Sequence, residues 1–299
     1  MDKNGFDLHH LRIFTALVKE KSFGAAAKVC DMTQPAVSFH LKSLEKKLGI
    51  LLVERTKRRL FITQAGEVFY KYAQEILSKC DEVRTRLSDL QNTISGHINI
   101  ATINSIGVYE LPKYVKKFLQ TYPTVNIYLS NHNQAAIYEL ATSNEVDFGI
   151  LAYPEGRPYL AVEPFIDEEM MVVCNPEHRL AKMRNVKLTV INHENFIAFE
   201  PNSSTREATD DLLRSRQVVV NITGAFDNIE LIKKSIEVGQ GIGILPKNSI
   251  QKECERGELY TLKLADVKFS RPLGIVYRKD KVLTTAMKLF LELLKKEKF

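Results

Sequence analysis

The stretch TQPAVSFHLKSLEKKLG, residues 33–49, restricts the possible folds of this chain more than any other segment. Val37, Leu41 and Leu44 recur at helical spacing and predict one buried face. Pro35 falls in the first turn, where its missing N–H removes no helical hydrogen bond. The other face begins with short side chains that can donate or accept hydrogen bonds and only later becomes a solvated, charged surface. Such a helix is expected to present its first turns to a polar partner.

The residues before this stretch predict two further helices. Apolar residues at helical spacing form a first helix that begins near Leu8. Ser22 is a suitable N-cap for a second helix, Phe23–Cys30, whose alanines allow close packing. A two-residue turn follows, and Thr33 caps the third helix. This is a helix-turn-helix pattern, in which the N-terminal residues of the last helix enter the major groove of DNA.

The first turns of this third helix, from Thr33 onward, carry side chains that are predicted to hold or read DNA. Gln34 can pair bidentately with adenine, and Ser38 can reach a base or a phosphate. His40 and Lys42 can reach the DNA backbone.

Two short alternating strands, Leu51–Glu54 and Leu60–Thr63, are predicted after this helix. The turn that joins them is basic and carries Arg55, Lys57, Arg58 and Arg59. A basic hairpin beside a helix-turn-helix is a wing, suited to phosphates or to the adjacent minor groove.

The distribution of charge agrees with a DNA-binding head. Residues 1–60 hold 12 Lys and Arg against 6 Asp and Glu, so all of the formal net charge of +6 belongs to them. In the rest of the chain the numbers of basic and acidic side chains are equal. This asymmetry is typical of a small module that meets a polyanion and is attached to a larger neutral body.

Length and composition limit the rest of the chain. Its 299 residues exceed what one core usually supports, so two or three domains are expected. The N-terminus has no apolar signal core and no later run is long enough to span a membrane, which predicts a soluble, cytoplasmic protein without a membrane partner. His9 and His10 have no carboxylate or cysteine at ligand spacing, which favours solvated or packing roles. The cysteines are far apart: Cys30, Cys80, Cys174 and Cys254. Neither a metal site nor a disulfide framework nor a cofactor is therefore predicted.

Residues 10–67 resemble the N-terminal domain of LysR-type transcriptional regulators. The match comprises the run Thr33–Ser38 together with Phe14, Ser22, Phe23, Ala26, Ala27, Leu44, Glu45, Leu48, Gly49, Leu52, Arg55 and Thr63–Gly66. The resemblance implies a winged helix-turn-helix, residues 1–64, in which Arg55 contacts the DNA backbone or minor groove. The residues that it places against the DNA are Gln34, Pro35, Ala36 and Ser38.

One residue departs from the pattern of this family. Many members carry Arg directly after the Ser of this run, where this sequence has Phe39. An apolar ring could contact a thymine methyl group instead. The base preference at that point is therefore open.

A long uninterrupted helix is predicted from Gln64 to about Leu90. Its apolar residues are spaced close to a heptad seam: Phe69, Tyr72, Ile76, Cys80, Val83, Leu87 and Leu90. The helix could pack against a domain of its own chain. The resemblance favours a linker helix, residues 65–92, that pairs with its copy in a homodimer and sets DNA half-sites about 34 Å apart or a multiple of that distance.

After residue 95, short apolar strands alternate with helices, which predicts a mostly parallel sheet covered by helices on both faces. Such sheets bind ligands at the carboxyl ends of their strands. Two polar loops follow strands there, Thr102–Gly107 and Glu200–Glu207. Ser204 and Glu207 have the spacing of a capping box, which alone indicates a helix cap more than a binding site.

The resemblance gives these loops more weight. LysR-type regulators have a two-lobed effector domain similar to periplasmic binding proteins, here residues 93–299, and their inducers usually lie between such loops. One lobe would comprise residues from about 95 to 165 together with 268–299. The other lobe would comprise about 166–267. The matching residues, with Asn228 at the start of a further helix, are Thr102, Asn104, Ser105, Ser203, Ser204 and Thr205.

The sequence thus predicts an α+β multidomain protein: an N-terminal winged helix-turn-helix, a long linker helix and a C-terminal two-lobed α/β effector domain resembling periplasmic binding proteins. It would bind double-stranded DNA sequence-specifically under control of a small anionic or polar metabolite, as a homodimer or a dimer of dimers able to contact RNA polymerase. An enzyme is the competing class, but residues 95–299 show no pair of nucleophile and base, metal cluster or phosphate loop. A purely architectural DNA-binding protein is the other alternative, and it would not need a large neutral α/β region.

Overall fold

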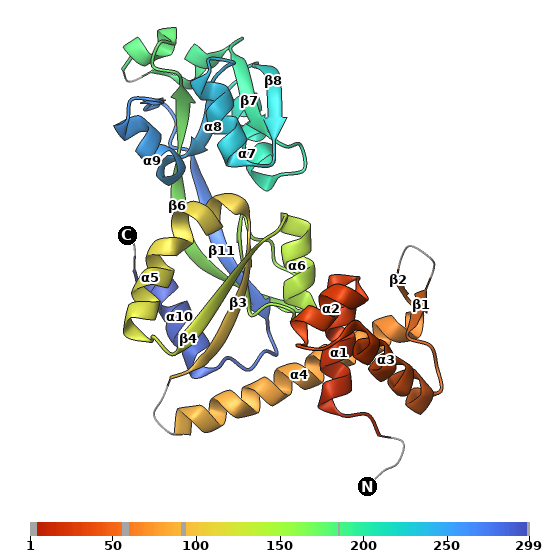
Figure 1. Ribbon diagram of the computed structural model, residues 1–299. Coiled ribbons are helices and arrows are strands. Elements are labelled where there is room, and N and C mark those ends of the chain that lie inside the picture. The colour runs from red at the N-terminus through yellow and green to blue at the C-terminus, as the bar shows by residue number, and fades with distance from the viewer. Residues whose placement is uncertain (1–4, 56–59, 91–93, 185, 298–299) are drawn as a thin grey trace. The chain divides into compact units, whose positions relative to one another are not determined.

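The computed structural model describes residues 5–55, 60–90, 94–184 and 186–297, without the side chains of Arg55, 84–86 and 88–90. The chain divides into two compact units, Met1–Thr93 (unit 1) and Ile94–Phe299 (unit 2) (Figure 1). No helix in the described ranges is both long and apolar enough to cross a lipid bilayer.

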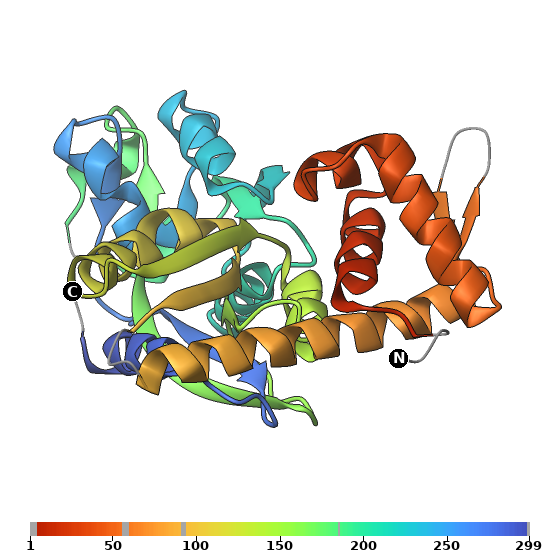
Figure 2. The same cartoon turned by 60° about the horizontal axis from the view of Figure 1, so that its bottom comes forward.

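Unit 1 is a helix-turn-helix followed by a two-stranded hairpin and one long helix. Its elements are α1 (Leu8–Glu20), α2 (Phe23–Val29), α3 (Gln34–Leu48), β1 (Val53–Arg55), β2 (Leu60–Ile62) and α4 (Gln64–Leu90). The predicted N-caps are confirmed, because the side chain of Ser22 accepts a hydrogen bond from the N–H of Ala25 and that of Thr33 accepts one from Ala36. Figure 2 shows α4 as a single uninterrupted helix.

The core of unit 1 packs the first three helices together and against the start of the hairpin. Its most deeply buried side chains, each at most 2% exposed, include Phe14 and Leu17 of α1, Leu41 and Leu44 of α3, and Leu52. Because these contacts involve one face of α3, the opposite face of that helix is left at the surface.

Unit 2 is an α/β fold with two lobes. Lobe I contains β3 (Gly96–Thr102), η1 (Ile106–Glu110), α5 (Leu111–Thr121), β4 (Val125–Asn131), α6 (Gln134–Thr142), β5 (Phe148–Ala152) and α10 (Thr285–Lys296). Lobe II contains η2 (Arg179–Lys182), η3 (Leu188–Ile191), β7 (Asn195–Phe199), α7 (Ser204–Ser215), β8 (Asn221–Phe226), α8 (Ile229–Glu237), β9 (Gly243–Pro246), α9 (Lys247–Glu255) and β10 (Tyr260–Leu262). Two long strands, β6 (Leu160–Cys174) and β11 (Ser270–Arg278), pass through both lobes (Figure 1).

Side chains of β6 enter the cores of both lobes. Phe165 packs into the lobe I core beneath α5 and α10, whereas Met170 and Val172 belong to the lobe II core. Ile275 of β11 lies in the lobe I core as well. Helix α6 covers the other face of the lobe I sheet, where Ile137 is fully buried. The two long strands therefore join the lobes through packed side chains as well as through the backbone.

The prediction of a mostly parallel sheet is wrong for the main sheet. Its strand order is β10-β6-β11-β5-β3-β4, with β9 also paired to β6. Strand β3 is parallel to β4 and β5, but β11 is antiparallel to β5 and β6, and β6 is antiparallel to β9 and β10. The reason is topological: the chain enters lobe II on β6 and returns on β11, so these neighbouring strands run in opposite directions. In lobe II, β7 and β8 form a separate parallel pair.

Gly66, in the first turn of α4, packs directly against the hairpin of unit 1. A Cβ atom at this position would lie 2.1 Å from the carbonyl oxygen of Leu52 and 2.7 Å from Cγ1 of Ile62. The Thr63 hydroxyl secures the same turn, because it donates to the carbonyl of Leu51 and accepts from the N–H of Gly66. Close approach of the backbone, and no unusual φ, requires glycine here.

We expect Gly66→Ala to lower the free energy of unfolding by about 1–3 kcal/mol, because the added methyl group overlaps the backbone of the hairpin. Gly24→Ala is the matched control, since outside its chain neighbours and its own helix backbone the nearest atom to its Cβ would be 4.0 Å away. That substitution should instead stabilise α2 by up to about 1 kcal/mol. Urea unfolding followed by circular dichroism compares the two variants, and equal stability would contradict the packing described for Gly66.

Candidate functional site

The exposed face of α3 carries a ridge of side chains at helical spacing. The ridge consists of Pro35, Phe39, Lys42 and Lys46, which are all exposed, and the exposed Gln34 lies beside it. The buried side chains of the helix occupy the opposite face. The ridge therefore offers an apolar ring and two ammonium groups to a partner, and Gln34 adds an amide beside them.

The other predicted DNA contacts at the start of α3 lie close to this ridge. The hydroxyl of Thr33 accepts a hydrogen bond from the N–H of Ala36 at 3.4 Å and so caps the helix. Ala36 and Ser38 are partly exposed. The main role of Thr33 is therefore to cap α3, whereas the amide of Gln34 lies at the surface.

Glu45 ties α3 to the hairpin. Its Oε1 accepts hydrogen bonds from the N–H groups of Leu52 at 2.9 Å and Val53 at 3.2 Å. The sequence pattern predicts a solvated, charged surface for this part of α3, and for Glu45 that prediction is wrong. The carboxylate instead satisfies two backbone donors where the chain enters β1, which fixes the wing relative to α3.

Three imidazole rings pack together between α1 and α3. The ring centroid of His40 lies 4.8 Å from that of His9 and 5.6 Å from that of His10, edge-on in both cases. Asp7 accepts a hydrogen bond from the backbone N–H of His10, and its Oδ1 lies 2.7 Å from the Nδ1 atom of that ring. These two bonds, the backbone one first, lower the pKa of Asp7 to about 2. Burial, and then the neighbouring rings of His9 and His10, lowers the pKa of His40.

This cluster changes two predictions. The N-terminal histidines have a packing role, as predicted, but the expectation that no carboxylate lies at suitable spacing is wrong, because Asp7 is bonded to His10 one helical turn away. The ring of His40, a predicted contact to the DNA backbone, packs within unit 1. Within the described ranges, no group of three or more His, Cys, Asp or Glu side chains has a geometry that could hold a metal ion.

The predicted wing contacts cannot be placed. Lys57, Arg58 and Arg59 lie outside the described residues, and so does the side chain of Arg55. The two strands that flank them are present, with Val53 paired to Ile62.

The predicted dimerisation residues of α4 differ in exposure. Four of them are exposed: Tyr72, Ile76, Val83 and Leu87. Cys80 is partly exposed, and the side chain of Leu90 lies outside the described residues. Phe69 instead packs edge-on against Phe6 and Phe14 of its own unit, with centroid distances of 5.3 and 5.2 Å. An apolar groove of about 630 Å³ lies beside the first turns of α4, and Tyr72 and Ile76 line it.

In unit 2, a buried ion pair lies where β6 and β11 pass between the lobes. Arg271 of β11 is 1% exposed, Glu168 of β6 is 5% exposed, and the register of the two strands places them opposite each other. Nε of Arg271 lies 2.8 Å from Oε2 of Glu168, and Nη2 bonds the same oxygen. Burial raises the pKa of Glu168, and the guanidinium opposes that shift. Each charge needs the other, because an isolated charge at this depth would be strongly destabilising.

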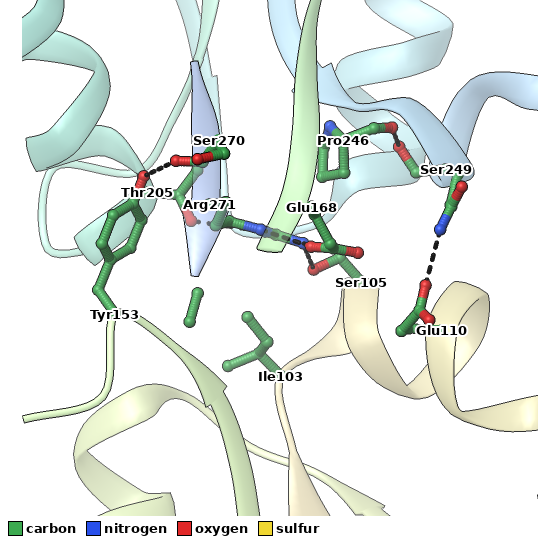
Figure 3. Close-up of polar contacts among 12 residues, drawn as sticks. Ile103, Ser105, Glu110, Tyr153, Glu168, Thr205, Pro246, Ser249, Ser270 and Arg271 are labelled. Carbon is green, nitrogen blue, oxygen red and sulfur yellow. Dashed lines mark hydrogen bonds and ion pairs between the residues drawn. The ribbon is translucent and has the colours of Figure 1, made fainter. Parts of the chain in front are cut away.

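The same guanidinium joins one loop from each lobe (Figure 3). Nη2 donates to Oγ of Ser105, in the loop after β3, at 3.2 Å. Nη1 lies 3.5 Å from Oγ1 of Thr205, in the first turn of α7. A hydroxyl that accepts from Arg271 keeps its own proton to donate. Two of the predicted effector residues are therefore brought together, and both are buried.

Two other predicted effector residues have structural partners. The hydroxyl of Thr102 donates to the carbonyl of Ile150 at 2.9 Å, which ties the end of β3 to β5. Oδ1 of Asn228 accepts from the N–H of Glu230 at 2.9 Å and caps α8.

The remaining predicted effector residues lie in the same two loops. The N-cap of α7 is Ser203, which has an extended backbone, so the capping-box prediction for Ser204 and Glu207 is wrong by one position. The side chain of Ser203 makes no cap hydrogen bond. Ser204 Oγ donates across the lobes to the carbonyl of Ala152 at 3.4 Å. Within the described residues, Oδ1 of Asn104 is buried and has no hydrogen-bond partner.

A second set of buried charges joins the lobes at η1, which is a π-helical turn. Nζ of Lys233, on α8, lies 2.7 Å from the hydroxyl of Tyr109 and 2.7 Å from Oε1 of Glu253. Asn248, on α9, donates to Oε2 of the fully buried Glu110 at 2.7 Å. Buried charges of this kind are stable only while they keep such partners. These contacts therefore hold the two lobes in the observed arrangement.

Sequence patterns did not identify Arg271 and Glu168 as members of this site. The available signal is a charged residue inside a strand that is otherwise largely apolar, as in the run SRPLGIVYR. Glu168 has an acidic neighbour, Glu169, that faces the other side of β6 and pairs with Lys247 at 2.9 Å. Nothing in the spacing shows which of the two acidic residues meets Arg271.

Both units match models of known families. Residues 8–67 match the bacterial regulatory helix-turn-helix protein of the lysR family, and residues 91–298 match the LysR substrate binding domain. A probable RuBisCO transcriptional regulator from Cyanophora paradoxa is 30% identical over 96% of this chain and 90% of its own length.

Two solved structures are also similar. The regulatory domain of CcmR from Synechocystis, in complex with 2-PG, is 28% identical, with a TM-score of 0.61 over 67% of this chain and 96% of that domain. Full-length CbnR complexed with its target DNA shares the fold, with 18% identity and a TM-score of 0.72 over 97% of this chain and 99% of CbnR.

Arg271→Met is expected to lower the free energy of unfolding by about 3–5 kcal/mol at neutral pH, because Glu168 stays buried without a countercharge. A carboxyl group whose pKa is raised on folding favours the folded state at low pH and disfavours it as pH rises. The loss should therefore shrink toward about pH 5 and grow at higher pH. Urea unfolding at several pH values measures it.

The double variant Arg271→Met with Glu168→Leu is the matched control, since it removes both charges. It should recover most of the lost stability. Losses that are independent of pH, or a double variant no more stable than the single one, would contradict the ion-pair account.

Proposed function

Because the chain belongs to the LysR family of transcriptional regulators, we propose that α3 reads a specific DNA sequence and that the lobe junction binds the small molecule controlling this reading. The family identifies the chain as a DNA-binding regulator with a ligand-binding substrate domain. Its relatives are regulators, so no catalytic step is assigned to any residue.

The exposed ridge of α3 supports the proposed reading of DNA. Gln34 would pair with a base, and Ser38 would contact a base or a phosphate. Lys42 would neutralise a phosphate, and the wing residues Arg55, Lys57, Arg58 and Arg59 would contact phosphates or the minor groove. The excess of basic residues in the first 60 positions supports this assignment.

We assign the exposed apolar row of α4 to a second copy of the chain. Tyr72, Ile76, Val83 and Leu87 are each at least 39% exposed, and the groove beside the first turns is apolar. A homodimer built on this helix would hold two α3 helices at a fixed separation, which requires half-sites about 34 Å apart or a multiple of that distance. Two such dimers could pair into a tetramer.

The proposal of an effector site rests on the hydrogen bonds that Arg271 makes to Ser105 and Thr205. Both hydroxyl groups accept from the guanidinium, so they offer donors to a ligand, and the N-terminus of α7 adds a positive dipole end. Donors alone select a ligand rich in acceptor oxygens, such as a carboxylate or phosphate. The 28% identical CcmR domain binds 2-PG, which makes 2-PG a rational first probe.

Control would follow from a two-state rearrangement of the lobes. A ligand that binds one arrangement more tightly shifts the equilibrium toward it. The shift would alter the assembly of subunits and hence the bending of DNA and the contact with RNA polymerase. A regulator of this kind would act on its DNA in the cytoplasm.

Selection of bound DNA from a random pool, at two salt concentrations, tests the DNA part. We expect an interrupted palindrome for the wild type and relaxed specificity at one position for Gln34→Ala, with little change in the salt dependence. Lys42→Ala is the matched control on the same ridge. It should reduce the salt dependence and leave the selected sequence unchanged, because a lysine that contacts phosphate carries no base information.

An absence of any enriched motif, with binding that merely fades in salt, would overturn sequence-specific reading. An unchanged motif in Gln34→Ala would leave a regulator that reads DNA through other residues.

A further inference from the structure

Phe39 is an exposed phenyl ring in the middle of the α3 ridge. Its side chain is 70% exposed, and its ridge neighbours at helical spacing are Pro35 and Lys42. An exposed ring gains little stability from burial in its own domain. The fold of unit 1 therefore does not explain an aromatic residue at this position.

The ring of Phe39 nevertheless has a neighbour that can fix its direction. It lies edge-on to the ring of His40, with centroids 5.9 Å apart. His40 in turn packs against His9 and His10 of α1, and His10 is bonded to Asp7. A chain of ring contacts thus leads from the N-cap of α1 to the exposed ring, and such support preorganises a side chain for binding.

We propose that Phe39 reads the 5-methyl group of a thymine and so determines base identity at one position of each half-site. The thymine methyl is the apolar group that base pairs present in the major groove, and a phenyl ring is one of its recognised partners. Lys42 lies one turn further along the ridge and Gln34 lies beside the start of the ridge, so these side chains can hold a phosphate and another base. The inference rests on the proposed DNA reading by α3 and adds the base that one residue selects.

Exposure alone would not carry this inference, because single exposed apolar residues are common. Val29 of α2, Tyr159 and Val238 are exposed to a similar degree. Phe39 differs because it lies on the ridge of α3, between side chains suited to bases and phosphates.

The experiment uses the operator selected by the full-length wild-type protein. Each thymine in one half-site is replaced in turn by deoxyuridine, which lacks the 5-methyl group and keeps every hydrogen-bonding atom. Affinity of the wild type should fall about fourfold at one position, the effect expected for burial of one methyl group. For Phe39→Ala, the same replacement at that position should have no effect.

Two further arms test the same contact in the opposite sense. A C·G pair placed at the sensitive position should bind the wild type more tightly when the cytosine is 5-methylated, since that methyl group occupies the same place in the groove. Phe39→Arg should shift the selected base at this position toward guanine, because arginine pairs bidentately with its O6 and N7 atoms.

Val29→Ala is the matched control, since it removes a similarly exposed apolar side chain from α2. It should keep the full sensitivity to deoxyuridine. Circular dichroism of each variant confirms that unit 1 is folded, and the exposure of both side chains predicts little loss of stability.

The outcomes separate this inference from the function on which it rests. If a motif is selected but no thymine shows a methyl effect that depends on Phe39, the inference is overturned and sequence reading by α3 stands. If no motif is selected, both fail. A methyl effect at one position that disappears only in the Phe39 variants establishes the contact.

Discussion

The ion pair between Arg271 and Glu168 is the interaction on which the two-lobed unit depends. Two buried charges persist only when they are paired and hydrogen-bonded, so β6 and β11 must run side by side at this point. The guanidinium also bonds Ser105 from lobe I and contacts Thr205 from lobe II. The side chain of Arg271 thereby links the two lobes and positions the hydroxyl groups that a ligand would contact.

Unit 1 uses a partly buried carboxylate in a comparable way. Glu45 satisfies two backbone donors at the start of the hairpin, and Gly66 lets α4 approach the same backbone closely. Together they fix the hairpin relative to α3 without using any side chain of the exposed ridge. Gln34, Phe39 and Lys42 thus remain at the surface on a rigid support, which is the arrangement that sequence reading requires.

The local signals of the first 60 residues made unit 1 predictable. The caps Ser22 and Thr33 were found because capping depends on residues within one turn. The roles of Arg271 and Glu168 could not be found in this way, because they are 103 residues apart and meet only when β11 returns beside β6. The same return explains why the sheet is mixed and not mostly parallel, since an alternation of strands and helices does not reveal strand direction.

The central claim is that a ligand at the lobe junction changes how the protein holds DNA. The most direct test is a hydroxyl-radical footprint on the selected operator, with and without a carboxylate or phosphate ligand that raises the melting temperature of the protein, starting with 2-PG. The account predicts that the ligand changes the protected length or the bending pattern of the DNA, and that DNA changes the ligand affinity by the same factor as the ligand changes the DNA affinity. A ligand that stabilises the protein but leaves both the footprint and the DNA affinity unchanged would contradict it.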